Sequence, residues 1–121
     1  MQTTKLQKIA VAALEDIKAR DIEVINTSKL TSMFDRIVVA SADSTRQVKA
    51  LARNVQEKVK EAGGDIIGVE GEEAGEWVLV DLGSVVVHVM QPAVRGYYNI
   101  EELWQARPGR APKKPATERV A

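Results

Sequence analysis

The 121-residue sequence contains no cysteine and a single histidine, His88. These absences exclude disulfide frameworks, thiol nucleophiles, cysteine-ligated zinc and any site built from several histidines. No apolar run approaches the roughly 18 residues that a membrane-spanning helix needs. The N-terminal residues also lack the apolar core and cleavage site of a signal peptide. We therefore expect a cytoplasmic protein with no membrane partner.

What is present has the composition of an ordinary soluble domain, with 45% apolar and 28% charged residues. The net charge is zero but unevenly distributed. Residues 1–104 carry 12 Lys and Arg against 16 Asp and Glu, whereas residues 105–121 carry 5 against 1. An acidic body is poorly suited to binding nucleic acid through a charged face of its own, and it is better suited to a basic protein partner.

The composition changes after Trp104. Residues 105–121 include three prolines and five basic residues, with almost no apolar side chain to bury. Such a segment cannot offset its conformational entropy by folding. We predict one domain over residues 1–104, followed by a disordered, basic, proline-rich tail over residues 105–121.

Apolar spacing predicts the secondary structure of the domain. Residues 4–20 and 44–62 have the three- and four-residue spacing of amphipathic helices, the second capped by Asp43 or Ser44 and stopped at Gly63. Strands are predicted over 22–25, 36–40, 66–69, 76–81 and 84–90, and a last helix over 97–105.

This order of elements predicts an α/β (α+β) fold, in which helices pack on a mixed five-stranded sheet. The strand-helix-strand run from residue 36 to residue 69 predicts a parallel crossover. The last two strands predict a hairpin that turns at Leu82-Gly83, which places Trp77 opposite His88.

Strand alternation divides this predicted hairpin into two faces. One face is uniformly branched and should point to the core: Val78, Val80, Val85, Val87 and Val89. The other is apolar but mixed: Trp77, Leu79, Asp81, Val86, His88 and Met90. With Tyr97 and Tyr98 following, the mixed face has the composition of a partner-binding site. If a helix covers this face, the same residues would instead belong to the core. The alternation does not distinguish a partner-binding face from a covered one.

Catalytic chemistry is not expected. Asp81, Ser84 and His88 lie along one hairpin with no nucleophile elbow, and no glycine pattern fits a phosphate-binding loop. The acidic run 70–76 lacks the spacing of a calcium loop and is expected to be a solvated connection. We predict no catalytic residue, no metal and no cofactor.

Seven short blocks carry a family likeness when taken in order. They are Ser32-x-x-Asp35-x-x-Val38-Val39, Ser44-x-x-Gln47-Val48, Gly68-x-Glu70-Gly71, Trp77-x-x-x-Asp81-x-Gly83, Val87-His88-x-Met90, Arg95-x-Tyr97-Tyr98 and Leu103-Trp104. As a set over residues 4–104 they resemble the ribosomal silencing factor family, also called Iojap-related. The resemblance implies a nucleotidyltransferase-like fold without its active site. The Gly-Ser and paired Asp-x-Asp of that superfamily are indeed missing at the second predicted strand, which reads Asp35-Arg36-Ile37-Val38-Val39.

The resemblance further implies a translational repressor that is not an enzyme. Such a factor binds the large ribosomal subunit through ribosomal protein uL14 and blocks joining of the small subunit when nutrients are scarce. The expected partner-binding residues are Trp77, Leu79, Asp81, His88, Met90, Tyr97 and Tyr98. The tail would add a weak contact with ribosomal RNA. Two alternatives remain: a nucleotidyltransferase-like enzyme using Asp35, Asp81 and His88, and a homodimeric scaffold that buries the Trp77 face.

Deletion of residues 106–121 tests the domain boundary. Because the tail has almost nothing to bury, we expect the free energy of unfolding to change by less than about 0.5 kcal/mol. Binding to the large subunit should stay nearly intact, and any electrostatic share from the tail should weaken as salt rises. Loss of most of the affinity at high salt would contradict this accessory role. Urea denaturation and subunit binding measure the two effects.

Overall fold

The computed structural model describes residues 1–105, and the tail predicted to be disordered lies outside these residues apart from Gln105. The elements, in chain order, are α1 (Thr3–Asp16), β1 (Arg20–Asn26), β2 (Arg36–Ser41), α2 (Thr45–Glu61), β3 (Gly68–Glu70), β4 (Trp77–Asp81), β5 (Val85–Met90), α3 (Pro92–Tyr98) and α4 (Ile100–Gln105). No helix in this part of the chain is long and apolar enough to cross a membrane.

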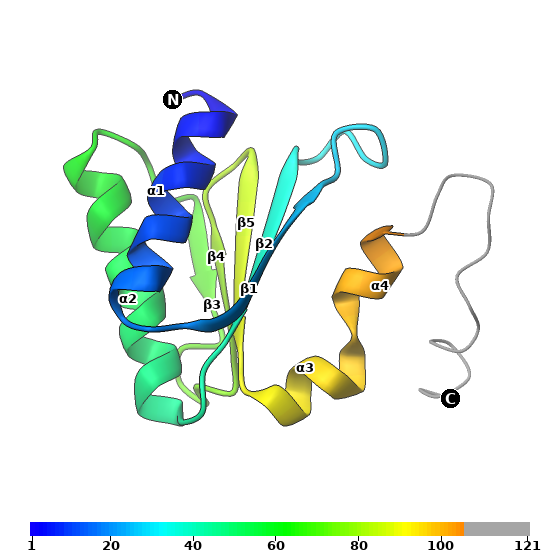
Figure 1. Ribbon diagram of the computed structural model, residues 1–121. Helices are drawn as coiled ribbons and strands as arrows, with labels where there is room; N and C mark the ends of the chain where they lie inside the picture. The colour runs from blue at the N-terminus through cyan, green and yellow to red at the C-terminus, as the bar shows by residue number, and fades with distance from the viewer. Residues whose placement is uncertain (106–121) are drawn as a thin grey trace.

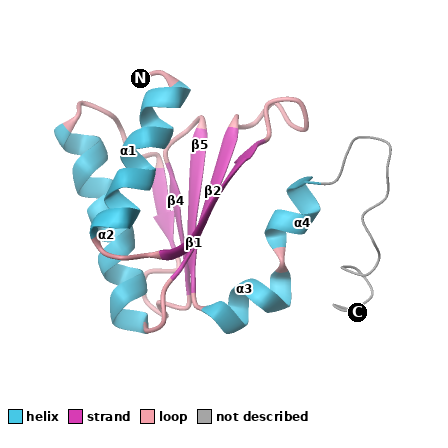
Figure 2. Ribbon diagram, in the orientation of Figure 1, coloured by secondary structure: helices cyan, strands magenta, loops and turns pink. Residues whose placement is uncertain are grey.

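The five strands form one mixed sheet in the order β1-β2-β5-β4-β3, which confirms the predicted fold class. β2 and β5 pair in parallel, and the other neighbours are antiparallel. β2 and β3 therefore run in the same direction, although β5 and β4 lie between them. α1 and α2 cover one face of the sheet, and α3 and α4 lie on the other side (Figures 1 and 2).

The main core lies between the sheet and the helices α1 and α2. It contains all five valines predicted to face inward, each completely buried: Val78, Val80, Val85, Val87 and Val89. Ser44 begins α2 as predicted, because its Oγ accepts a hydrogen bond from the Gln47 amide at 3.1 Å.

A second core lies on the opposite face of the sheet. Its buried members are Ile25, Ile37, Val39 and Met90, and α3 and α4 pack over them with Val94, Ile100 and Trp104. Phe34 adds an edge-to-face contact with Trp104, with ring centroids 5.4 Å apart. β2 and β5 are thus buried on both faces, as the continuous apolar run in β2 predicted.

The predicted last helix is wrong in its bounds, because the chain forms two helices there. Pro92 stands at the start of α3, where its missing N–H costs no hydrogen bond and its fixed φ suits a helix. Asn99 then adopts a left-handed conformation with φ 47°, which ends α3 before α4 begins at Ile100.

The predicted hairpin register is also wrong, by two residues. The turn lies at Gly83-Ser84: the Leu82 amide donates to the Val85 carbonyl at 2.9 Å. Gly83 supplies a φ of +95°, and its amide donates to Asp81 Oδ1 at 2.9 Å. Trp77 therefore pairs with Met90, and Leu79 pairs with His88. A shift of two residues leaves every side chain on its predicted face.

The edges of the sheet are irregular. The pairing of β1 with β2 shifts between Arg20 and Glu23, where Asp21 has a φ of 50°. α1 ends at Asp16 instead of Arg20, since Lys18 is left-handed with φ 63° and the chain turns into β1. At the other edge, β3 has only the three residues Gly68–Glu70.

Gly71 and Gly68 form a matched pair for a test of this fold. Gly71 has a φ of +86°, and a Cβ there would overlap the Trp77 carbonyl oxygen, whereas a Cβ on Gly68 would meet nothing within 4 Å. Gly71→Ala should therefore lower the free energy of unfolding by at least about 2 kcal/mol. Gly68→Ala should change it by less than about 1 kcal/mol in urea denaturation. Equal losses would show that the Gly71 turn is not constrained.

Candidate partner-binding face

Trp77 of β4 and His88 of β5 are joined by a hydrogen bond across the hairpin. The indole Nε1–H donates to His88 Nδ1 at 3.0 Å. An indole can only donate, so Nδ1 must carry no proton and Nε2 must hold the hydrogen of the neutral ring. The bond fixes both the imidazole tautomer and the orientation of the indole.

His88 is poorly placed to become charged. The residue is 8% exposed, and burial lowers its pKa from 6.5 to about 4. The imidazole is consequently neutral at pH 7, where it acts as an acceptor for Trp77. This role is positional, and it needs no proton transfer.

Two tyrosines from α3 extend the indole into an aromatic cluster. The ring centroids of Trp77 and Tyr98 lie 5.0 Å apart, and those of Tyr98 and Tyr97 lie 4.9 Å apart in an edge-to-face arrangement. Tyr97 is 59% exposed and Tyr98 is 48% exposed. Large aromatic side chains open to solvent are a common feature of binding surfaces.

The seven predicted site residues lie at different depths. Leu79 and Asp81 of β4 are half-buried beside Trp77, on the same sheet face as His88. Met90 is completely buried in the second core, so it supports Trp77 from below and offers no contact area of its own. We call the remaining six residues the aromatic face: Trp77, Leu79, Asp81, His88, Tyr97 and Tyr98. That this face binds a partner stays a prediction.

A polar cluster that the sequence reasoning missed holds α3 and α4 in place. Arg95 Nε donates to Glu101 Oε2 at 3.0 Å, and Arg95 also donates through its Nη1 to Ser41 Oγ at 2.8 Å. The two charged side chains are only 11% and 16% exposed. Arg95 stood beside Tyr97 and Tyr98 in one of the sequence blocks. That position was the available signal for its role.

Gln91, directly after β5, holds the border of the aromatic face that lies next to α2. Its Nε2 donates to Thr45 Oγ1 and to the Gly75 carbonyl, each at 3.1 Å. These bonds tie the acidic connection between β3 and β4 to the start of α2. Beyond this connection, Glu70, Gly71, Trp77 and Leu79 line a shallow hollow of about 260 Å³. Its lining combines the apolar side chains of Trp77 and Leu79 with one carboxylate, that of Glu70.

The three residues of the enzyme alternative make no hydrogen bond with one another within the described part of the chain. Asp35 accepts from Thr3, Asp81 from the Gly83 amide and His88 from Trp77, so each of the three has a separate partner. Among the described residues, no group of three or more His, Asp or Glu side chains could hold a metal ion.

Comparison with known proteins agrees with the resemblance seen in the sequence blocks. The family model described as "Ribosomal silencing factor during starvation" matches residues 1–120. The chain belongs to this family. Ribosomal silencing factor RsfS of Chromobacterium violaceum is 64% identical over 104 residues, covering 86% of this chain and 85% of that protein. Ribosomal silencing factor RsfS of Bacillus subtilis is 38% identical, with 89% and 92% covered.

The fold of this silencing factor family member is also found in solved structures. A crystal structure of a Chromobacterium violaceum protein superimposes with a TM-score of 0.86 at 59% identity, covering 95% of this chain and 98% of that one. Sequence and fold thus support the same family.

The burial of His88 makes the stability of the fold depend on pH. Burial holds the pKa of His88 at about 4 in the folded chain, whereas its ordinary value, which the unfolded chain restores, is 6.5. As pH falls, His88 therefore takes up a proton in the unfolded chain before it does so in the folded chain. The contribution of neutral His88 to the free energy of unfolding is complete above pH 6.5 and is lost as pH falls towards 4. The loss should be on the order of 3 kcal/mol.

His88→Asn is the matched variant, because its Oδ1 can take the place of Nδ1 as acceptor but cannot titrate. Urea denaturation at several pH values, followed by circular dichroism, should show a steeper acid loss for the parent protein. Parallel curves for the two proteins would mean that His88 does not control this dependence.

Proposed function

We propose that this chain represses translation by binding the large ribosomal subunit through ribosomal protein uL14. A body of this kind, bound near the subunit interface, occupies space that the small subunit needs. No bond is made or broken in such a mechanism, so no catalytic residue is required. The family membership supports the ribosomal role, and the single structural observation that carries the proposal is the aromatic face.

The aromatic face has the features of a protein-docking surface. Trp77 and Tyr98 are held by neighbouring rings and by the His88 bond, so they lose little conformational entropy when a partner covers them. Leu79 supplies apolar area beside them, and Asp81 and Glu70 add carboxylates that suit a basic partner. We propose residues 1–104 as the ribosome-binding domain, acting in the cytoplasm, and the basic tail as an accessory contact to ribosomal RNA.

A sucrose gradient with purified ribosomal subunits tests this function. The protein should migrate with the large subunit and not with the small one, and it should reduce the amount of joined ribosomes. Migration with neither subunit would contradict the proposal. A nucleotide-dependent reaction that vanishes in Asp81→Asn would favour the enzyme alternative. A dimer in solution that dissociates in Trp77→Ala would favour the scaffold.

Trp77→Ala should weaken binding to isolated uL14 by about 2 kcal/mol or more, which is roughly thirtyfold. Its loss of folding stability should be smaller, because the indole is only half-buried. Isothermal titration calorimetry and thermal melts measure the two effects.

Val87→Ala is the control for this substitution. Val87 is completely buried in the main core, so the change should destabilise the fold by roughly 1 to 3 kcal/mol and leave binding by the folded fraction unchanged. If Trp77→Ala melts like a core variant and still binds normally, Trp77 serves packing alone.

A further inference from the structure

Positive charge in the body of the protein is concentrated in α2. Within Thr45–Glu61 there are five Lys and Arg against two Glu. In the remainder of residues 1–104 there are 7 Lys and Arg against 14 Asp and Glu. The negative net charge of the body therefore conceals one basic helix in an acidic surround.

Four of these basic residues form a stripe along the outer side of the helix. Arg46, Lys49, Arg53 and Lys60 follow spacings of three, four and seven residues, which places them on one side. The buried residues Val48, Leu51, Val55 and Val59 occupy the other side. At a rise of 1.5 Å per residue the stripe is about 21 Å long. Glu57 is the one acidic residue on it.

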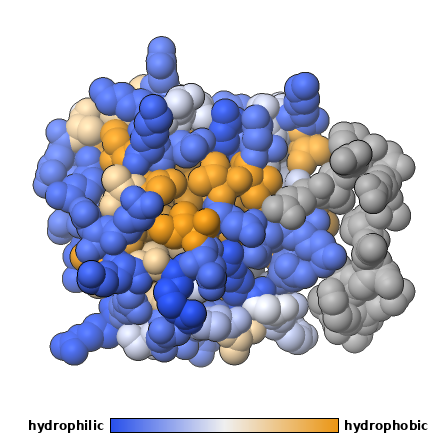
Figure 3. Space-filling model, viewed as in Figure 1, coloured by the Kyte–Doolittle hydropathy of each residue, from blue (hydrophilic) through white to orange (hydrophobic). Residues whose placement is uncertain are grey.

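The stripe is available to an external anion. Arg46, Arg53 and Lys60 are exposed, and Lys49 is half-buried. Within the described part of the chain, no carboxylate oxygen lies within 4.0 Å of the side-chain nitrogens of these four residues. The surface over α2, at the left of Figure 3, is mostly hydrophilic.

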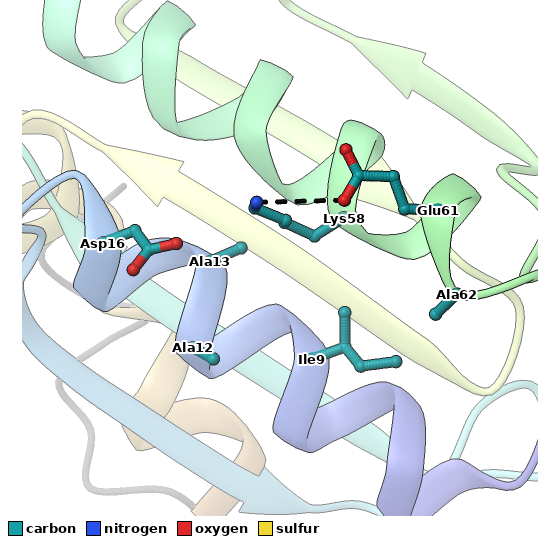
Figure 4. A pocket seen from close by; sticks show the side chains of 7 residues that line it. All are labelled: Ile9, Ala12, Ala13, Asp16, Lys58, Glu61 and Ala62. Carbon is teal, nitrogen blue, oxygen red and sulfur yellow. Dashed lines mark ion pairs between the residues drawn. The ribbon is translucent and has the colours of Figure 1, made fainter.

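Lys58, the fifth basic residue of α2, differs from the stripe because it has an acidic partner. It lies beside the groove between α1 and α2, where its Nζ is 3.8 Å from Glu61 Oε1 (Figure 4). The groove side of the helix is therefore balanced in charge, and the outer stripe is not. Two glutamates bring negative charge near the stripe. Glu72 and Glu73 line a hollow of about 270 Å³ together with Lys49 and Arg53.

The stripe and the aromatic face lie on opposite layers of the molecule. α2 covers one face of the sheet, and the aromatic face with α3 lies on the other (Figure 1). A protein docked at Trp77 would leave the outer side of α2 free. The two surfaces can therefore be occupied at the same time.

We propose that the α2 stripe contacts phosphates of ribosomal RNA while the aromatic face holds a protein of the large subunit, an inference that rests on the proposed function. RNA phosphate is the polyanion of that environment, and exposed Arg and Lys bind it without reading sequence. Each phosphate contact releases counterions, so the binding constant falls with salt by about 0.7 to 0.9 log units per log unit of salt.

The test compares two triple charge reversals in the full-length protein. Arg46→Glu/Arg53→Glu/Lys60→Glu reverses three of the four charges of the stripe. Lys5→Glu/Lys8→Glu/Lys18→Glu makes the same change in net charge at exposed positions on or just after α1. Binding to purified large subunits is measured over a series of KCl concentrations, and binding to isolated uL14 is measured alongside. Thermal melts verify that both variants are folded.

The stripe variant should bind the large subunit at least about tenfold more weakly at low salt, and the magnitude of its salt slope should fall by about 2. Its binding to isolated uL14 should be unchanged. The α1 variant should stay within about threefold of the parent. Glu72→Gln/Glu73→Gln should act in the opposite direction and strengthen binding at low salt.

Three results would overturn the inference. Equal losses in both triple variants would indicate a general charge effect. Weaker binding of the stripe variant to isolated uL14 would make α2 part of a protein interface. An unchanged salt slope would show that α2 contacts no phosphate. Failure of the parent protein to bind large subunits would refute the proposed function itself, which is a different outcome from all three.

Discussion

Everything in this structure depends on a sheet whose two central strands are apolar on both faces. β2 and β5 are almost completely buried, so the sheet must be covered twice. The helices α1 and α2 provide one long cover. The second cover is much smaller, because α3 and α4 together have 13 residues. It protects Ile37, Val39 and Met90 but leaves much of β4 uncovered. The aromatic face lies where this second cover ends.

The small cover is held by polar bonds as well as by packing. α3 has no buried residue, and the contact between Arg95, Glu101 and Ser41 joins it to α4 and to the end of β2. A buried ion pair offsets its own desolvation and adds little net stability, but breaking one partner is costly. Its value here is geometric. It fixes the segment that carries Tyr97 and Tyr98 next to Trp77.

Much of the fold could be predicted because it follows from local periodicity. Alternation assigned the five inward valines and Trp77 to opposite faces, and this assignment survived a register error because the error was an even number of residues. The turn itself was misplaced since Gly83 can serve either position of a two-residue loop. The break at Asn99 was missed because apolar spacing continues through it, and a left-handed asparagine leaves no mark in that pattern.

The depth of each site residue could not be read from the sequence. Met90 and Leu79 belong to the same face, yet Met90 is buried and Leu79 is not, because α3 and α4 reach only one of them. Long-range contacts decide this, and periodicity is local. Summed charge hides a related feature: it averages over the whole body and does not show that five of its basic residues lie in α2.

The irregular outer edge of β1 has a consequence for the behaviour of the protein at high concentration. A flat, regular edge strand offers unpaired amides and carbonyls to any other strand and so invites aggregation. Here the left-handed Asp21, the shifted pairing and the charges of Arg20 and Glu23 interrupt that ladder. The opposite edge is only three residues long. Edge-to-edge growth of the sheet is thus disfavoured at both ends.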